Sequence, residues 1–87
     1  MAWQIIYGGR SRNELSKLSK AILERTLSAF ESKLLRDPIR HSKPLSGSLR
    51  EYRVFRVGDY RILFSLRVDE EMIVVHKIAH RREVYER

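Results

Sequence analysis

Apolar residues near the start of the chain form a strand-like run and then a sparser, helix-like pattern. Ala2–Tyr7 is short, apolar and rich in β-forming residues, and it ends at a pair of glycines. This pattern predicts a first strand. Ser11 and Asn13 are candidate N-caps for a short helix that carries Leu15 and Leu18.

A second helix is predicted from an apolar stripe at helical spacing. The stripe has spacings of 4, 3 and 4 and consists of Leu23, Leu27, Phe30 and Leu34, with Ile22 beside it. Ser19 is the candidate N-cap, and the helix is expected to run to about Arg36. Pro38 prevents the helix from continuing. Two amphipathic helices in succession therefore predict a helical hairpin that lies on a sheet.

The second half of the chain alternates turn signals with strand-like segments. Asp37–Ser48 holds both prolines and is expected to be the main loop. Arg50–Val57, Tyr60–Val68 and Met72–Ala79 are then predicted to form a three-stranded antiparallel meander. The predicted fold is α+β with the order β-α-α-β-β-β. The helices pack on one sheet face, and the first strand joins the sheet at an edge.

Strand alternation assigns side chains to the two faces of the sheet. We expect one set to face the helices: Tyr60, Ile62, Phe64 and Leu66. Arg61 then projects from the opposite, solvent-facing side. In the last strand, Val75, Lys77 and Ala79 are expected to alternate with Val74, His76 and Ile78. In the strand before these, strict alternation places Arg53 and Arg56 on opposite faces, so either a bulge or an edge position is expected.

Composition limits the class of protein. The chain has 87 residues, 43% hydrophobic and 33% charged, which fits one folded domain spanning residues 1–87. Cysteine is absent, which excludes disulfides and thiolate metal sites and fits a reducing compartment. No apolar run reaches the roughly 20 residues of a membrane span, and no signal pattern precedes the first strand. We therefore expect a cytoplasmic protein.

Charge points to a polyanionic or acidic partner. The formal net charge is +7, and 13 of the 18 basic residues are arginine. Arginine pairs bidentately with phosphate and stays charged. Six basic residues lie between Arg40 and Arg61, against only Glu51 and Asp59. A phosphate-binding cleft and a merely solvated basic face explain this pattern about equally well.

The C-terminal tail favours chemistry on RNA. His80-Arg81-Arg82-Glu83-Val84-Tyr85 brings histidine, arginine and tyrosine into one segment. Cleavage by a ribose 2′-hydroxyl needs a proton acceptor, a proton donor and cations, and these residue types supply them. The alternative is a tyrosine that packs on the sheet and an ordinary surface histidine. No paired-histidine zinc motif occurs, and the acidic residues cluster in one turn, so no metal or cofactor is expected.

Several segments resemble the RelE/ParE toxin superfamily, and more closely its RelE branch. These are Lys43-Pro44-Leu45-Ser46-Gly47, Tyr52-Arg53, Arg56-Val57-Gly58-Asp59-Tyr60-Arg61-Ile62 and Lys77-Ile78-Ala79-His80-Arg81-Arg82-Glu83-Val84-Tyr85. The resemblance implies the toxin of a type II toxin–antitoxin system, neutralised by an acidic antitoxin. RelE-like toxins cleave mRNA in the ribosomal A site without metal, through attack of the 2′-hydroxyl.

The resemblance also implies roles for individual residues. Arg61, Arg81 and Tyr85 match catalytic positions of RelE, and His80 is a candidate base. The basic side chains expected to bind RNA or the ribosome are Lys43, Arg50, Arg53, Arg56, Lys77 and Arg82. RelE proteins carry lysines on the first meander strand where this chain has arginines. Since arginine is a poor base, proton transfer would pass to His80, Tyr85 or Lys77.

Two other functions remain open at this point. A ParE-like toxin would inhibit DNA gyrase by protein contact, without catalysis. A non-catalytic module would only bind RNA or an antitoxin. ParE relatives generally lack the tail tyrosine, so Val84-Tyr85 favours the RelE-like function.

Overall fold

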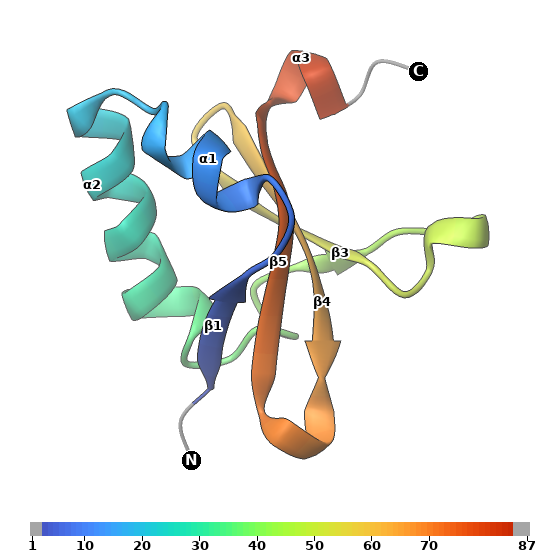
Figure 1. Ribbon diagram of the computed structural model, residues 1–87. Coiled ribbons are helices and arrows are strands. Elements are labelled where there is room, and N and C mark those ends of the chain that lie inside the picture. Colours follow the sequence, from blue (N-terminus) through green and yellow to red (C-terminus); the bar gives the residue numbers. More distant parts are fainter. Residues whose placement is uncertain (1–2, 85–87) are drawn as a thin grey trace.

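A single five-stranded sheet forms the body of the protein (Figure 1). The computed structural model describes residues 3–84. The strands are β1 (Gln4–Tyr7), β2 (Lys43–Pro44), β3 (Arg53–Val57), β4 (Tyr60–Arg67) and β5 (Met72–His80). Their order in the sheet is β1-β5-β4-β3-β2, with β1 parallel to β5 and every other pair antiparallel. The predicted meander and the edge position of the first strand are confirmed.

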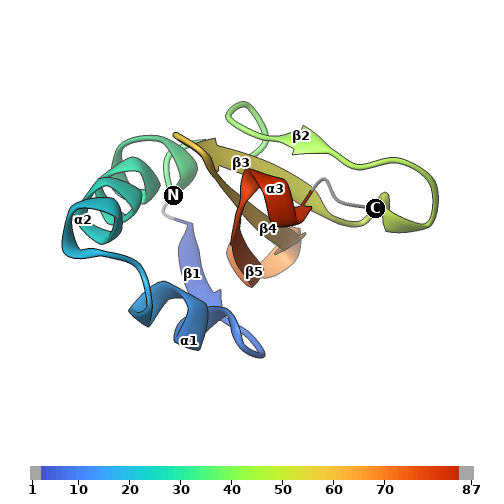
Figure 2. The same cartoon turned by 90° about the horizontal axis from the view of Figure 1, so that it is seen from above.

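The helices lie mainly on one side of this sheet, as Figure 2 shows for α1 and α2. They are α1 (Ser11–Ser16), α2 (Lys20–Ala29) and a short C-terminal α3 (Arg81–Val84). The predicted α+β class and element order are confirmed, with two additions. The predicted loop contains the two-residue strand β2, and α3 follows β5. Within residues 3–84, no helix has the length and hydropathy needed to cross a membrane.

The end of α2 explains which of its side chains reach the core. Ser19 caps the helix as predicted, with its hydroxyl accepting a hydrogen bond from the Ile22 amide at 3.3 Å. After Ala29 the chain continues as a π-helical turn, Phe30–Leu34. Buried positions then recur every four residues, at Thr26, Phe30 and Leu34. The predicted stripe is therefore wrong at Leu27, which is 40% exposed.

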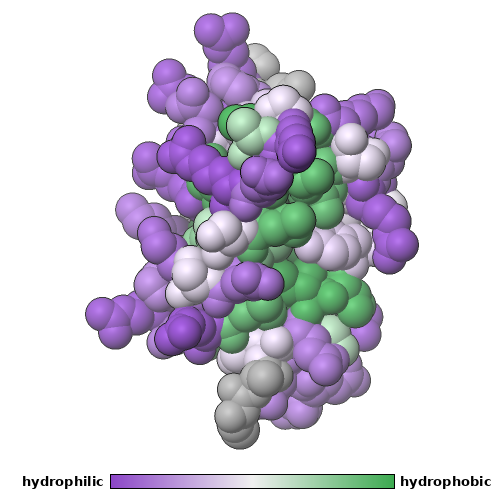
Figure 3. All heavy atoms as spheres, turned by 90° about the vertical axis from the view of Figure 1, so that its left-hand side faces the viewer, coloured by the Kyte–Doolittle hydropathy of each residue, from purple (hydrophilic) through white to green (hydrophobic). Residues whose placement is uncertain are grey.

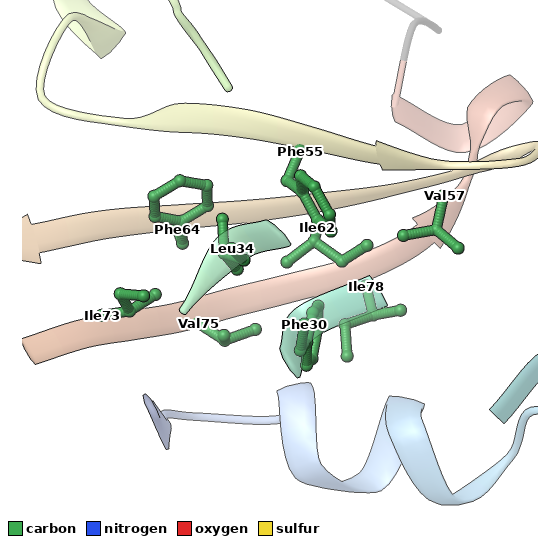
Figure 4. Close-up of a cluster of buried hydrophobic side chains, with 9 residues drawn as sticks. All are labelled: Phe30, Leu34, Phe55, Val57, Ile62, Phe64, Ile73, Val75 and Ile78. Atoms are coloured by element: carbon green, nitrogen blue, oxygen red, sulfur yellow. The ribbon is translucent and has the colours of Figure 1, made fainter. Parts of the chain in front are cut away.

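The core lies between α2 and the helix-facing side of the sheet. Nine buried side chains form it, and Figure 4 draws them together: Phe30, Leu34, Phe55, Val57, Ile62, Phe64, Ile73, Val75 and Ile78. The Phe30 and Phe55 rings meet at 6.1 Å between centroids. Ile62 and Phe64 are completely buried, and Tyr60 and Leu66 pack against the cluster. The predicted face of β4 is thus confirmed.

A bulge in β5 changes its alternation. Leu63 pairs with Lys77 while Phe64 pairs with Val75, so the ladder skips His76. The extra residue shifts the phase of the strand, and Val75 and Ile78 both face the core. The expected grouping of Val75 with Lys77 and Ala79 on one face is therefore wrong.

Side chains of α1 seal the outer edge of β5 beyond the end of β1. The Ser11 hydroxyl lies within hydrogen-bond distance of the carbonyl oxygens of Gly8 and Val75, at 2.7 and 3.0 Å, and shares its one proton between them. The Glu14 carboxylate accepts one from the Ile78 amide at 2.8 Å. Ser11 is thus the first residue of α1 and holds it on the sheet, so its predicted role as an N-cap is wrong.

Candidate functional site

Four arginines lie on segments that meet at the turn between β3 and β4, and we call them the arginine cluster: Arg25, Arg56, Arg61 and Arg81. A guanidinium nitrogen of Arg61 donates to the carbonyl oxygens of Gly58 and Tyr60, at 3.4 and 3.3 Å. The Arg81 amide donates to the Asp59 carbonyl at 2.6 Å. Arg56 is paired directly with Arg61 in the β3–β4 ladder. Residues that are 20 positions apart in sequence, Arg61 and Arg81, therefore meet at one turn.

Arg25 reaches the same turn from α2. A Cβ atom built on Gly58 would lie 3.2 Å from a guanidinium nitrogen of Arg25. Gly58 has φ +59°, a conformation that glycine adopts without steric cost. Glycine is therefore favoured at position 58 for two reasons. It adopts the backbone conformation of the turn, and it leaves room for the Arg25 guanidinium.

Arg61 is buried rather than solvent-facing. It lies on the face opposite Ile62 and Phe64, as predicted, but its exposed fraction is only 4%. The helix α3 packs at this end of β4 and β5, and the guanidinium folds back onto the turn carbonyls. The expectation of a solvent-facing side chain is thus wrong, because α3 and the turn cover it.

The cluster concentrates positive charge at one end of the sheet. Arg25, Arg56 and Arg81 are exposed there. The ion pairs found among the described residues lie elsewhere, between Arg10 and Glu14 and between Arg67 and Glu70. Clustered like charges raise the local concentration of anions and favour phosphate binding. The cluster can therefore bind an anion and stabilise charge that develops on it.

His80 lies apart from Arg61. It pairs with Tyr60, on the helix-facing side of the ladder, and the two rings meet edge to face with centroids 5.4 Å apart. Its Nδ1 accepts a hydrogen bond from the Arg82 amide at 3.3 Å. The ring lines a pocket of about 290 Å³ together with Glu14 and Lys17. The fourth predicted catalytic residue, Tyr85, lies outside the described residues.

A larger groove runs along the β2–β3 edge, and we call it the basic groove. Its volume is about 790 Å³. Its basic side chains are Lys33, Arg40, His41, Lys43 and Arg56. Its apolar floor consists of Pro44, Leu45, Leu49, Val54 and Phe55. The groove thus joins two predicted RNA contacts, Lys43 and Arg56, to three further basic side chains.

The other predicted RNA contacts are dispersed. Arg53 holds the preceding loop, because its guanidinium donates to the Ser42 hydroxyl at 2.6 Å and to the Ile39 carbonyl at 3.1 Å. Arg50 is exposed just after a 3₁₀ turn, and Arg82 is exposed in α3. Lys77 is half-buried opposite Leu63, on the open face of the sheet. Strict alternation in β3 places Arg53 and Arg56 on opposite faces of the sheet. Arg53 can lie on the helix-facing side because it is the first residue of the strand, where its guanidinium holds the preceding loop.

Two contributors to these surfaces could not be found from sequence. Arg25 and Lys33 lie on a helix and look like ordinary solvent-facing charges, and only packing against the sheet brings them to the turn and the groove. Among residues 3–84, no three histidine or acidic side chains are grouped so that they could hold a metal ion.

Comparison with known proteins places the chain in a family. The model of the ParE toxin of type II toxin–antitoxin systems matches residues 5–85. The chain belongs to this toxin family. The toxin is 29% identical to toxin RelG of Mycobacterium tuberculosis, over the whole length of both chains. The resemblance to the RelE/ParE superfamily is confirmed.

Solved structures agree with this assignment. A chain of the toxin–antitoxin complex RelBE2 from M. tuberculosis superposes with a TM-score of 0.85 at 26% identity, covering 92% of this toxin and 99% of that chain. Isolated Escherichia coli RelE shares the fold, with a TM-score of 0.73 at 17% identity, covering 91% of this toxin and 84% of that chain.

Proposed function

We propose that this toxin is a ribosome-dependent endonuclease that cleaves messenger RNA in the A site without a metal ion. The arginine cluster is the observation on which this proposal rests. Arg61 and Arg81, the two positions that match catalytic arginines of RelE, lie at one turn with Arg56 beside them. The similarity to RelG and to RelE structures supports the same assignment.

The proposed reaction is an internal phosphoryl transfer. A base removes the proton of the ribose 2′-hydroxyl, the oxygen attacks the adjacent phosphorus, and the bond to the 5′-oxygen breaks. The leaving 5′-oxygen takes up a proton, and the products end in a 2′,3′-cyclic phosphate and a 5′-hydroxyl. Arg61 and Arg81 stabilise the negative charge that builds up on the phosphate in the transition state.

The proton-transfer residue is proposed to be Tyr85 or His80. The His80 ring faces the helices beside Tyr60, and its Nδ1 already accepts a backbone hydrogen bond. This placement of His80 favours Tyr85 as the proton-transfer residue. A free tyrosine titrates near pH ~10, so to act as a base Tyr85 would need arginine charge close by to favour its tyrosinate form.

Substitutions in a translation assay separate these roles. Purified toxin is added to translating ribosomes, and the new mRNA ends are mapped. Tyr85→Phe removes only a hydroxyl, and His80→Gln removes only the imidazole. A large loss in Tyr85→Phe with little loss in His80→Gln assigns the proton to tyrosine, and the reverse pattern assigns it to histidine. Arg67→Ala is the matched control, because Arg67 is an exposed arginine at the opposite end of β4.

The alternative function is inhibition of DNA gyrase by protein contact. The matching family model is described as the ParE toxin, which favours this candidate. A gyrase supercoiling assay with the same preparation tests it. Inhibition of supercoiling, with intact mRNA on translating ribosomes, would replace the endonuclease proposal. A protein that does neither would be a non-catalytic binding module in the cytoplasm.

The proposed partner is an acidic antitoxin that covers apolar as well as basic surface. The similar RelBE2 chain comes from a toxin–antitoxin complex. Apolar side chains form a band between charged ones on the side that carries α2 and β1 (Figure 3). Ile6 of β1 is 39% exposed and Leu27 of α2 is 40% exposed. Expression of the toxin alone should therefore arrest growth, and co-expression with its antitoxin should restore it.

A further inference from the structure

Three side chains form a cluster on the open face of the sheet, away from the arginine cluster: Ser65 of β4, His76 of β5 and Tyr52, which directly precedes β3. The Ser65 hydroxyl and His76 Nε2 are hydrogen-bonded at 2.8 Å. The Tyr52 ring meets the His76 ring at 5.1 Å between centroids, with an interplanar angle of 89°. All three side chains are half-buried. Tyr52 thus has a fixed position on the open face of the sheet, and we call the cluster the tyrosine platform.

The bulge in β5 builds this cluster. The ladder skips His76, so the residue falls out of regular alternation and reaches Ser65 on β4. Burial lowers the pKa of His76 below its ordinary value, so the ring is neutral near pH 7. Ser65 fixes the His76 ring, and the His76 and Tyr52 rings pack edge to face. The cluster therefore holds an uncharged aromatic group on the open face of the sheet, where Lys77, the residue after His76, also lies.

We propose that the tyrosine platform is a stacking site for one nucleobase of single-stranded RNA. Rigid aromatic rings on a cationic sheet face are the usual means of holding unpaired bases. Purines are expected to bind best, because they offer the larger π-face. The proposal rests on RNA being the substrate, as proposed above.

The position of the platform separates it from the chemistry. Ser65 lies four residues beyond Arg61 on β4, which at the rise of a strand is about 13 Å. A base on the platform therefore belongs to a nucleotide beside the one that is cut. The platform accordingly sets register and nucleotide preference, and it takes no part in proton transfer.

Fluorescence of a base analogue tests the contact directly. Short single-stranded oligoribonucleotides carry 2-aminopurine at successive positions, and stacking on an aromatic ring quenches its fluorescence. We expect strong quenching at one position with wild-type toxin and with Tyr52→Phe. Tyr52→Leu should abolish that quenching and weaken binding on the order of tenfold to a hundredfold. Arg67→Ala should leave the quenching pattern unchanged.

Two further measurements examine the same contact. If Tyr52→Leu does not fold, NMR of the wild-type toxin replaces it, and the Tyr52 ring protons should shift upfield when the oligonucleotide is added. Unchanged Tyr52 resonances, or equal quenching by Tyr52→Leu, would overturn the platform. His76→Leu should weaken position-specific quenching through loss of the ring that orients Tyr52.

The ribosome assay distinguishes this proposal from the proposed function. If wild-type toxin cuts mRNA and Tyr52→Leu cuts the same sites at the same rate, the platform fails while the endonuclease stands. If no mRNA is cut but Tyr52-dependent quenching persists, the platform stands and the endonuclease fails. An altered site preference with retained cleavage supports both.

Discussion

Two buried hydroxyls in this toxin should respond in opposite ways to removal. Ser11 and Thr26 are both completely buried. The Ser11 hydroxyl donates to the Gly8 and Val75 carbonyl oxygens, whereas the Thr26 hydroxyl has no partner within the described residues. A buried hydroxyl without a partner keeps its desolvation cost, and removing it with an isosteric group is neutral or stabilising.

Thr26→Val should therefore raise the free energy of unfolding by about 1 kcal/mol. Valine keeps the branched shape, so no cavity forms, and its helix propensity is similar. For a domain of this size, 1 kcal/mol corresponds to a rise of about 4–8 °C in melting temperature. Ser11→Ala should lower stability by about 1 kcal/mol. The loss is modest because the Gly8 and Val75 carbonyls each retain a backbone donor, at 3.0 and 2.9 Å.

Urea unfolding and thermal melts of the isolated toxin measure both changes. Thr26→Ala serves as the control, because it removes the hydroxyl together with a buried methyl group and should be destabilising. Destabilisation by Thr26→Val of more than about 1 kcal/mol would show that the hydroxyl has a hydrogen-bond partner in solution, and the reasoning from burial would be wrong.

Other predictions concern the site and its surroundings. Arg81→Ala and Arg61→Lys should each reduce mRNA cleavage on ribosomes about 10²-fold or more, and Arg61→Lys also keeps a charge in the buried position. Ribosome affinity should fall by orders of magnitude as salt rises several-fold, and a flat salt dependence would contradict phosphate contact. Gly58→Ala should cost about 1–2 kcal/mol in urea unfolding, because of its φ of +59° and the Arg25 guanidinium. Burial lowers the pKa of His76 below its ordinary 6.5 in the folded toxin, so the unfolded chain takes up the proton first as the pH falls. The free energy of unfolding should therefore decline on acidification, and His76→Gln should reduce the slope of that decline against pH.

Local patterns in the sequence were sufficient where the structure is regular. Alternation placed Ile62 and Phe64 in the core, because β4 is continuous over the core and its partner β3 is regular. The same rule failed in β5, where one extra residue at His76 reverses the phase. The predicted helical stripe failed at Leu27 for a similar reason. Around the π-helical turn the buried positions recur every four residues, at Thr26, Phe30 and Leu34, and Leu27 is left exposed. Both errors come from single-residue irregularities that periodicity cannot reveal.

The site was predictable only in part, for a related reason. Resemblance to the family identified Arg61 and Arg81 as candidate catalytic residues, and the fold places them at one turn. Arg25 carries no such signal, since its contact with Gly58 depends on how α2 packs over the turn. The charge of Arg53 suggested RNA contact, and the structure adds a role that the sequence did not indicate, because its guanidinium holds the preceding loop. Charge in sequence indicates a possible ligand, but packing decides which charges are available to bind it.

Burial of Arg61 limits how the proposed reaction can proceed. With only 4% of the residue exposed, a phosphate group cannot contact the guanidinium in the isolated fold. The guanidinium must first leave the Gly58 and Tyr60 carbonyls, and these hydrogen bonds are long, at 3.4 and 3.3 Å. Phosphate offers the guanidinium a full negative charge and a bidentate pair of acceptors, which an uncharged carbonyl does not, and this favours contact with RNA once the cover at this end of the sheet moves. Arg25, Arg56 and Arg81 lie exposed around the same turn and can hold the phosphate before Arg61 reaches it. The order of contacts that follows is exposed arginines first and the buried arginine last, which couples charge stabilisation to correct docking on the ribosome.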